Sequence, residues 1–283
     1  MATFYNKATL TYNDGSLESN VVSGEIAEVL SMTKTALEAN YNLRDPNTYI
    51  VSIVNSGSTP VTGLTLTDNL GEYTYLTSTL TPLDYEVGSV RYFSNGVLQP
   101  APTVTAQSAL TVTGINVPAN GNAQIIYKVN TNEYAPLGAG AQITNTATLS
   151  GAALPNDITD SATVDHANIP DLSITKSLSP ETVTENSELT YTFTIQNRGT
   201  APITAADNAS VTDTFDPVLN NITVTLDGRT LTAGTDYTYD TETGVFTTTA
   251  GTITVPAAAF STDATGAWTV TPGVTTLKVT GTI

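Results

Sequence analysis

The stretch Leu189-Thr190-Tyr191-Thr192-Phe193-Thr194-Ile195-Gln196-Asn197 decides the fold of this chain of 283 residues. Large apolar side chains alternate along it with threonine or glutamine. Successive side chains of a β-strand point to opposite faces, so this alternation predicts a strand with one buried side and one solvent-facing side. The abundance of Thr, Val and Tyr, with 20 Gly and 14 Pro, favours strands and turns over helices in the rest of the chain.

The same pattern occurs earlier in the chain. Asn47-Thr48-Tyr49-Ile50-Val51-Ser52-Ile53-Val54-Asn55 aligns with the first stretch, and both continue through a proline, Pro60 or Pro202, to a Thr-Asp step. Short strands separated by Asn-Gly, Gly-Thr and Pro-containing turns are typical of immunoglobulin-like β-sandwiches. We therefore predict an all-β chain with two tandem immunoglobulin-like β-sandwich domains.

The repeat also sets the predicted domain boundaries. We expect a first sandwich over residues 25–165 and a second over residues 166–283, connected by the polar, proline-containing stretch 165–171. Residues 1–24 are predicted to be an N-terminal donor strand with its linker.

The two copies differ at their ends. Domain 1 runs on into Ile143-Thr144-Asn145-Thr146-Ala147-Thr148-Leu149, and domain 2 has no such segment before Ile283. A related segment, Phe4-Tyr5-Asn6-Lys7-Ala8-Thr9-Leu10, opens the chain. Both segments precede a Leu-Ser-x-Thr-Lys motif, at 30–34 and 172–176. We expect domain 2 to lack its last strand.

A neighbouring subunit is the predicted source of that strand. If its opening segment adds to the edge of domain 2, copies of the chain join head to tail into a homopolymer. The donor-strand residues that share the inward phase are Phe4, Asn6, Ala8 and Leu10.

Three polar residues of domain 1 share a phase with core-facing apolar residues, namely Lys34, Asp68 and Asn145. Burial lowers the pKa of a Lys and raises that of an Asp, so the two can share one proton. A neutral Lys amine is a nucleophile, and a protonated Asp68 can polarise the carboxamide and pass protons to the leaving ammonia. We predict an isopeptide bond between Lys34 and Asn145. The alternatives are a buried salt bridge, or a slipped phase that points Lys34 to water.

Domain 2 repeats two of these residues as Lys176 and Asp213, and the Asn is absent from it. Its counterpart in the chain is Asn6. We therefore predict a second isopeptide bond, between Lys176 of one subunit and Asn6 of the next, with Asp213 as its catalytic residue.

Composition limits the partners and the location. The net charge of −17, with nine Lys and Arg residues, disfavours a nucleic-acid partner because phosphates would be repelled. There is no cysteine for a disulfide, and no apolar run of membrane-spanning length. No signal peptide is visible at the start, so export would follow processing or release by lysis. We expect an extracellular protein of a spore or cell surface, without membrane insertion.

Three classes of function remain. The first is a structural subunit of a surface filament. The second is an adhesin or glycan-binding spacer of a larger surface protein, in which Tyr237 and Tyr239 would stack on sugars. An enzyme acting on an external substrate is disfavoured, because one His and no Cys leave no convincing triad. We expect no cofactor and no metal, and the only predicted catalysis is autocatalytic bond formation.

Several of these motifs resemble a known family. The segments are 171–176, 191–199, the Val-Thr-Asp step at 211–213, and 145–148. They resemble the tandem conserved repeat domain of unknown function of Gram-positive surface proteins, which includes isopeptide-forming fimbrial proteins. That resemblance implies the cross-linking roles given above. The organisation is also similar to the main structural proteins of ribbon-like appendages on spores of anaerobic bacteria, which implies paralogous appendage subunits as further partners. The missing Asn of domain 2 departs from the family pattern.

Overall fold

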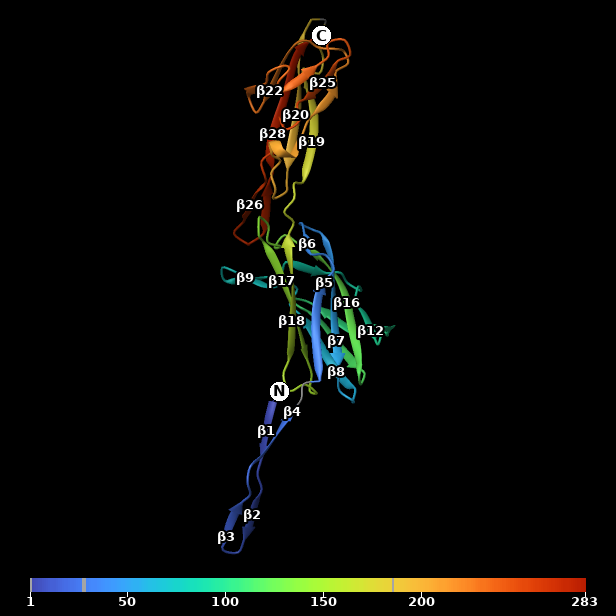
Figure 1. Ribbon diagram of the computed structural model, residues 1–283, viewed down its shortest axis with the longest axis vertical. Coiled ribbons are helices and arrows are strands. Elements are labelled where there is room, and N and C mark those ends of the chain that lie inside the picture. The colour runs from blue at the N-terminus through green and yellow to red at the C-terminus, as the bar shows by residue number, and fades with distance from the viewer. Residues whose placement is uncertain (1, 27–28, 185) are drawn as a thin grey trace. The chain divides into compact units, whose positions relative to one another are not determined.

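The computed structural model of the protein describes residues 2–26, 29–184 and 186–283, and it is built almost entirely from strands (Figure 1). Over these residues it has one short 3-10 helix, Ala205–Asp207, and no α-helix. The described part of the chain accordingly contains no helix able to cross a bilayer. The all-β fold class is confirmed.

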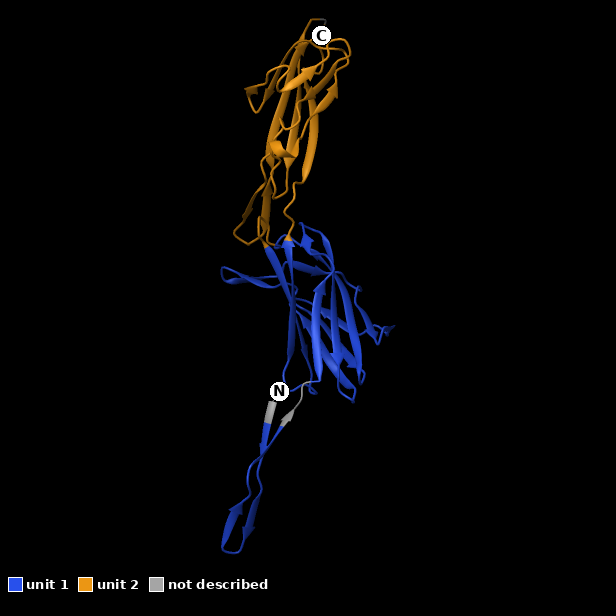
Figure 2. Ribbon diagram, in the orientation of Figure 1, with its two compact units in different colours: residues 1–135, 142–165 blue, residues 136–141, 166–283 orange. Residues whose placement is uncertain are grey.

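The strands gather into two compact units (Figure 2). Unit 1 consists of residues 1–135 and 142–165, and unit 2 of residues 136–141 and 166–283. Strand β18 (Ile158–His166) overlaps the predicted connection 165–171 at Asp165 and His166.

Unit 1 is a sandwich of two six-stranded sheets. The first sheet has the order β13-β12-β16-β7-β5, and β11 also pairs with β16. Its strands are β5 (Leu30–Ala36), β7 (Pro46–Asn55), β11 (Leu83–Tyr85), β12 (Arg91–Ser94), β13 (Val97–Leu98) and β16 (Gly121–Thr131).

The second sheet of unit 1 has the order β14-β15-β8-β17-β18-β6. Its strands are β6 (Asn40–Tyr41), β8 (Val61–Asp68), β14 (Thr103–Ala106), β15 (Leu110–Val117), β17 (Gln142–Ser150) and β18 (Ile158–His166). A separate pair, β9 (Tyr73–Tyr75) and β10 (Ser78–Leu80), lies outside both sheets. The inner rows of the two sheets form one apolar core, as the predicted alternation requires.

Unit 2 has a first sheet of the order β19-β20-β28-β22-β23 and a second, shorter one of the order β21-β25-β24. The first contains β19 (Leu172–Ser179), β20 (Glu188–Asn197), β22 (Asn220–Leu226), β23 (Arg229–Thr230) and β28 (Gly273–Thr282). The second contains β21 (Thr212–Thr214), β24 (Tyr237–Tyr239) and β25 (Val245–Thr248). A further pair is β26 (Ala259–Thr262) and β27 (Trp268–Thr271).

Strand order shows what the second copy lacks. The first sheets correspond strand for strand, since β19, β20 and β28 of unit 2 follow the order of β5, β7 and β16 in unit 1. In the second sheets, β24, β25 and β21 follow the order of β14, β15 and β8. Unit 1 then continues with β17 and β18. In the described part of unit 2 the sheet stops at β21.

The start of the chain is a hairpin rather than one strand with a linker. β1 (Ala2–Asn6) pairs with β4 (Val22–Ile26), and β2 (Thr9–Tyr12) pairs with β3 (Gly15–Glu18). The loop of Asn13 and Asp14 closes it, and both residue types favour turns. The sequence did not predict β3 and β4 because their Gly, Ser and Glu residues are typical of a linker.

Candidate cross-linking sites

Lys34 is buried in the core of unit 1. It lies on β5, whose exposure alternates residue by residue, and it shares the inner face with Leu30 and Met32. Its ammonium Nζ donates to Asp68 Oδ2 at 2.5 Å, and neither side chain is exposed. The backbone N–H of Lys34 donates to Asp160 Oδ2 of β18 at 2.6 Å. The slipped phase that would point Lys34 to water is therefore not what the structure has.

Asp68 ends β8 and holds three donors. Its Oδ1 accepts from the backbone N–H of Leu70 at 3.0 Å. Its Oδ2 accepts from Lys34 and also from the hydroxyl of Tyr127, the latter at 2.5 Å. A carboxylate with this many donors is fixed in orientation, and the same oxygen faces both the amine and a second acidic proton.

Asn145 lies on β17, beside β8, and is fully buried. Its Oδ1 accepts from the backbone N–H of Gly71 at 3.2 Å, so a donor already polarises the carbonyl. Its Nδ2 donates to the hydroxyl of Tyr127 at 3.4 Å. The structure thus brings Lys34, Asp68 and Asn145 into one buried cluster, in which Tyr127 joins the Asp to the Asn.

Tyr127 is the residue that sequence reasoning missed. It lies on β16 in phase with Ile125 and Val129, and a Tyr in such a row is ordinarily interpreted as core packing. Its ring does stack on Tyr49, with 5.7 Å between ring centroids. Only the three-dimensional arrangement shows that its hydroxyl lies between Asp68 and Asn145.

Burial sets the protonation of this cluster. It lowers the pKa of Lys34 to about 8, although the charge of Asp68 and the hydrogen bond from Lys34 to it act in the opposite direction. Burial, reinforced by Asp68, raises the pKa of Tyr127 well above its ordinary value. Lys34 is consequently much closer to its neutral, nucleophilic form than a surface lysine, and Tyr127 stays a proton donor.

Unit 2 repeats half of this arrangement at its surface. Lys176 on β19 forms an ion pair with Asp213 on β21, and their side chains are 40% and 20% exposed. The Lys176 ammonium lies over the Tyr191 ring, 4.4 Å from its centroid. Val279 stands opposite Tyr191 in the sheet, as Tyr127 stands opposite Tyr49 in unit 1. Unit 2 therefore has the Lys and Asp, without the bridging hydroxyl.

An apolar groove of about 200 Å³ lies along the first residues of β19, the strand that carries Lys176. Its lining consists of Leu172, Ser173, Ile174, Ile195, Ile203, Ala209, Ser210, Val211, Ile253 and Val255. Leu172 and Ile174 are 47% and 55% exposed, whereas their counterparts in unit 1, Leu30 and Met32, are each 7% exposed. The difference follows from β17 and β18, which have no counterpart in the described part of unit 2.

The predicted donor residues lie in the N-terminal hairpin. Phe4 and Leu10 are 53% and 64% exposed, and Asn6 and Ala8 are exposed as well. Within the hairpin Asn6 stands opposite Val22. A junction of Asn6 with Lys176 of another subunit stays a prediction.

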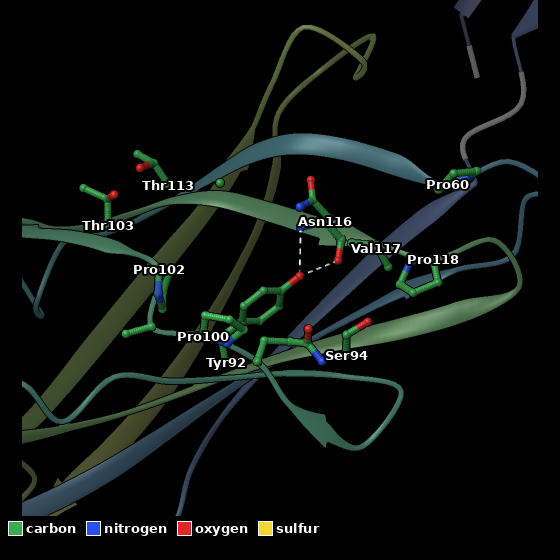
Figure 3. A pocket seen from close by; sticks show the side chains of 13 residues that line it. Pro60, Tyr92, Ser94, Pro100, Pro102, Thr103, Thr113, Asn116, Val117 and Pro118 are labelled. Atoms are coloured by element: carbon green, nitrogen blue, oxygen red, sulfur yellow. Dashed lines mark hydrogen bonds between the residues drawn. The ribbon is translucent and has the colours of Figure 1, made fainter.

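The other candidate binding sites are Tyr237 and Tyr239 of β24 and one hollow of unit 1. Tyr237 is buried and the hydroxyl of Tyr239 bonds to the backbone of Leu219, so the strand that was a candidate for sugar stacking packs inward. A hollow of about 580 Å³ lies on unit 1 (Figure 3). There Tyr92 donates to Asn116 O at 2.6 Å and accepts from Asn116 N at 3.0 Å, so its hydroxyl is already engaged. Among the described residues, no three acidic or histidine side chains are grouped to hold a metal ion.

Comparison with known proteins gives one family match, the Sgo0707 N2 domain, over residues 167–276, which is less than half of the chain. Curated protein sequences give no match. Similar solved structures include the major pilin subunit BcpA of Bacillus cereus, 13% identical, covering 96% of this chain and 73% of that chain with a TM-score of 0.36. The pilus backbone RrgB of Streptococcus pneumoniae is 12% identical and covers 86% of this chain and 55% of that chain, with a TM-score of 0.35. The collagen adhesin CNA of S. aureus is 13% identical, covers 55% of each chain and has a TM-score of 0.30.

Proposed function

We propose that the protein is a structural subunit of an extracellular fibre of a cell or spore surface, and that copies join head to tail by strand exchange. One observation carries this proposal: among the described residues, the second sheet of unit 2 ends at β21, where that of unit 1 continues with β17 and β18. The exposed N-terminal hairpin carries the Asn-x-Ala-Thr-Leu sequence of the strand that occupies this place in unit 1. The chain thus has a groove and a matching segment that its own unit 1 does not use.

In unit 1 we propose an isopeptide bond between Lys34 and Asn145. Asp68 takes a proton from the Lys34 ammonium, and the neutral amine attacks Asn145 Cγ. The C–Nδ2 bond breaks, a second amine proton reaches Nδ2 through Asp68, and ammonia leaves. The product is one new amide bond, and the remaining proton goes to solvent or to the ammonia. The short Lys34–Asp68 contact and the donor on Asn145 Oδ1 support this course.

Between subunits we propose the same reaction, with Lys176, Asp213 and Asn6 of the neighbour. Burial of the Phe4 and Leu10 side chains contributes about 1.5–3 kcal/mol each. Association costs about 4–15 kcal/mol, so strand exchange by itself is reversible and the covalent bond makes it permanent. The only catalysis we assign to the protein is therefore the formation of its own bonds. Its principal partner is a second copy of itself, and paralogous appendage subunits are further candidates.

Intact-mass measurement and denaturing gels test the proposal. We expect folded protein to lack one ammonia, and the deficit to disappear in Lys34→Ala and in Asn145→Ala. At high concentration a ladder of covalent oligomers should form, and a peptide joining Asn6 to Lys176 should be recovered from it. A well-folded wild type of unmodified mass, with no ladder at any concentration, would refute the proposal.

A further inference from the structure

We infer that the segment completing unit 2 is the whole hairpin of residues 2–26 from a second copy of the chain, so that two strands are added and not one. This inference rests on the proposed function and specifies the partner surface. Docked in this way, β1 and β2 take the place of β17, and β3 and β4 take the place of β18.

First, unit 1 uses both β17 and β18 to cover its first sheet. β18 supplies Asp160, which accepts the backbone N–H of Lys34. Ile158 of β18 and Leu154 of the loop before it line the same pocket as Leu30. A single strand added beside β21 would take the place that β17, the strand with Asn145, has beside β8. It would leave Leu172 and Ile174 without the cover that β18 and its loop give in unit 1.

Second, each strand pair of the hairpin groups large apolar side chains on one side, with Phe4 and Val22 in β1–β4 and Leu10, Tyr12 and Leu17 in β2–β3. Residues directly opposite each other in a sheet point to the same side, so Leu17 joins Leu10 and Val22 joins Asn6. The exposed fraction is between 53% and 65% for each of the apolar side chains Phe4, Leu10, Tyr12, Leu17 and Val22. Lys7 and Glu18 form an ion pair at 2.7 Å, and Tyr5, which is 71% exposed, points to the side of β1 opposite Phe4.

The hairpin of β17 and β18 also groups apolar side chains on one side, and in unit 1 this side is buried. Its inner row includes Ile143, Leu149 and Val164, which are at most 2% exposed, and Ala162 at 9%. Ala162 stands opposite Asn145, as Val22 stands opposite Asn6. The free hairpin thus exposes the kind of face that unit 1 buries.

Third, the residues that set the pairing register of β17 with β8 in unit 1 recur in the hairpin and in β21. In unit 1, Ala147, Thr148 and Leu149 stand opposite Asp68, Thr67 and Leu66. The matching triplets are Ala8-Thr9-Leu10 on the hairpin and Val211-Thr212-Asp213 on unit 2. Setting Ala8 opposite Asp213 and Leu10 opposite Val211 gives Asn6 the position that Asn145 has beside Lys34.

Fourth, each of the two hairpins is followed directly in the chain by the first strand of a unit. In unit 1 the completing hairpin ends at His166 and leads through residues 167–171 into β19, the first strand of the next unit. The N-terminal hairpin ends at Ile26 and leads through residues 27–29 into β5, also the first strand of a unit. A donated hairpin therefore connects unit 2 of one copy to unit 1 of the next in the way the chain connects its own two units. A second copy is the occupant this pattern favours.

The test compares Val22→Asp with Ser23→Asp in the full-length protein, with wild type alongside. The two substitutions add the same charge to adjacent exposed residues of β4, on opposite faces. Docking of the hairpin would bury the unpaired carboxylate that Val22→Asp introduces, so we expect the ladder to fall at least about tenfold in this variant and to persist in Ser23→Asp. If the two variants polymerise equally while wild type forms its ladder, hairpin docking is wrong and single-strand exchange stands. If wild type forms no ladder, the proposed function itself fails.

A second measurement fixes the register and the occupant. The chain has no cysteine, so the double variant Thr9→Cys with Thr212→Cys carries only the two thiols that the register sets opposite each other. Under mild oxidation it should form reducible dimers and longer oligomers faster than the matched control, Thr11→Cys with Thr212→Cys. Equal rates in the two variants would overturn the register. A disulfide confined to monomers would overturn the inference that a second copy is the donor.

Discussion

At the scale of single residues, Tyr127 is a difference between the Lys34 site and the Lys176 site, because unit 2 has Val279 in the corresponding place. Its hydroxyl donates to Asp68 and receives the Nδ2 donor of Asn145, so it can hold both groups and relay a proton between them. We expect Tyr127→Phe to slow formation of the Lys34–Asn145 bond about 10- to 100-fold. The loss of stability should be only about 1 kcal/mol.

The control for this variant is Tyr49→Phe, which removes a neighbouring hydroxyl and keeps the stacked pair of rings. Both variants are refolded from inclusion bodies, and the loss of ammonia is followed by intact mass while circular dichroism reports the fold. Equal rates in the two variants would show that Tyr127 only packs.

The pH dependence of the reaction follows from the same cluster. Because burial lowers the pKa of Lys34 to about 8, the Lys34–Asp68 pair holds one shared proton below that pH and loses it above. The reaction needs this proton to pass from the Lys34 ammonium to Asp68, because the transfer frees the amine for attack and supplies the acid for the leaving ammonia. We expect a constant rate between about pH 6 and about pH 8, then a decline approaching tenfold per pH unit.

Refolding of the wild-type chain across this range, with the ammonia loss timed by mass spectrometry, gives the profile. A rate that instead climbs through pH 8 would mean that deprotonation of the lysine limits the reaction and that Asp68 does not act as the acid.

At the scale of elements, β21 is an edge strand in the described subunit, and it would become an inner strand in the proposed fibre. Its counterpart β8 pairs with strands on both sides, and Thr67 stands opposite Thr148 of β17. Thr212 is the residue of β21 at the equivalent position, and β21 pairs only with β25. We expect the amide of Thr212 to exchange with deuterium quickly in subunits and at least about tenfold more slowly in fibres.

The peptide containing Thr67 is the internal control, because β8 already has its neighbour and its exchange should be the same in both states. Unchanged exchange at Thr212 on polymerisation would mean that no strand adds to β21.

The strand pattern was predictable because alternation along β7 and β20 is a local property of the chain. The inward phases of Lys34, Asp68 and Asn145 were predictable for the same reason. Two features were not. Tyr127 acts through contacts with residues of other strands, which no spacing along the chain encodes. The strands β3 and β4 have a polar, Gly- and Ser-containing sequence, and their pairing with β1 and β2 is what makes them strands.

At the scale of the whole molecule, the described residues form one sandwich of two six-stranded sheets, a second sandwich whose shorter sheet ends at β21, and an exposed N-terminal hairpin. In the proposed fibre, the groove of each molecule receives the hairpin of the next, so every link uses two different surfaces. An interface of this heterologous kind does not close on itself in pairs, and it extends into a filament. The covalent part of each link also divides between partners, with Lys176 and Asp213 on one and Asn6 on the other.

That division allows the polarity of the fibre to be tested by mixing. Asn6→Ala keeps a reactive groove and loses the reactive hairpin, whereas Lys176→Ala keeps the reactive hairpin and loses the reactive groove. Both residues are exposed, so the fold should tolerate the changes. Neither variant alone should form covalent oligomers. Mixed in equal amounts, they should give one covalent dimer on a denaturing gel and nothing longer, because the dimer has no reactive end left. If the mixture gives longer covalent species, other residues form the link. If the dimer is absent while wild type forms a normal ladder, Asn6 and Lys176 do not react across subunits.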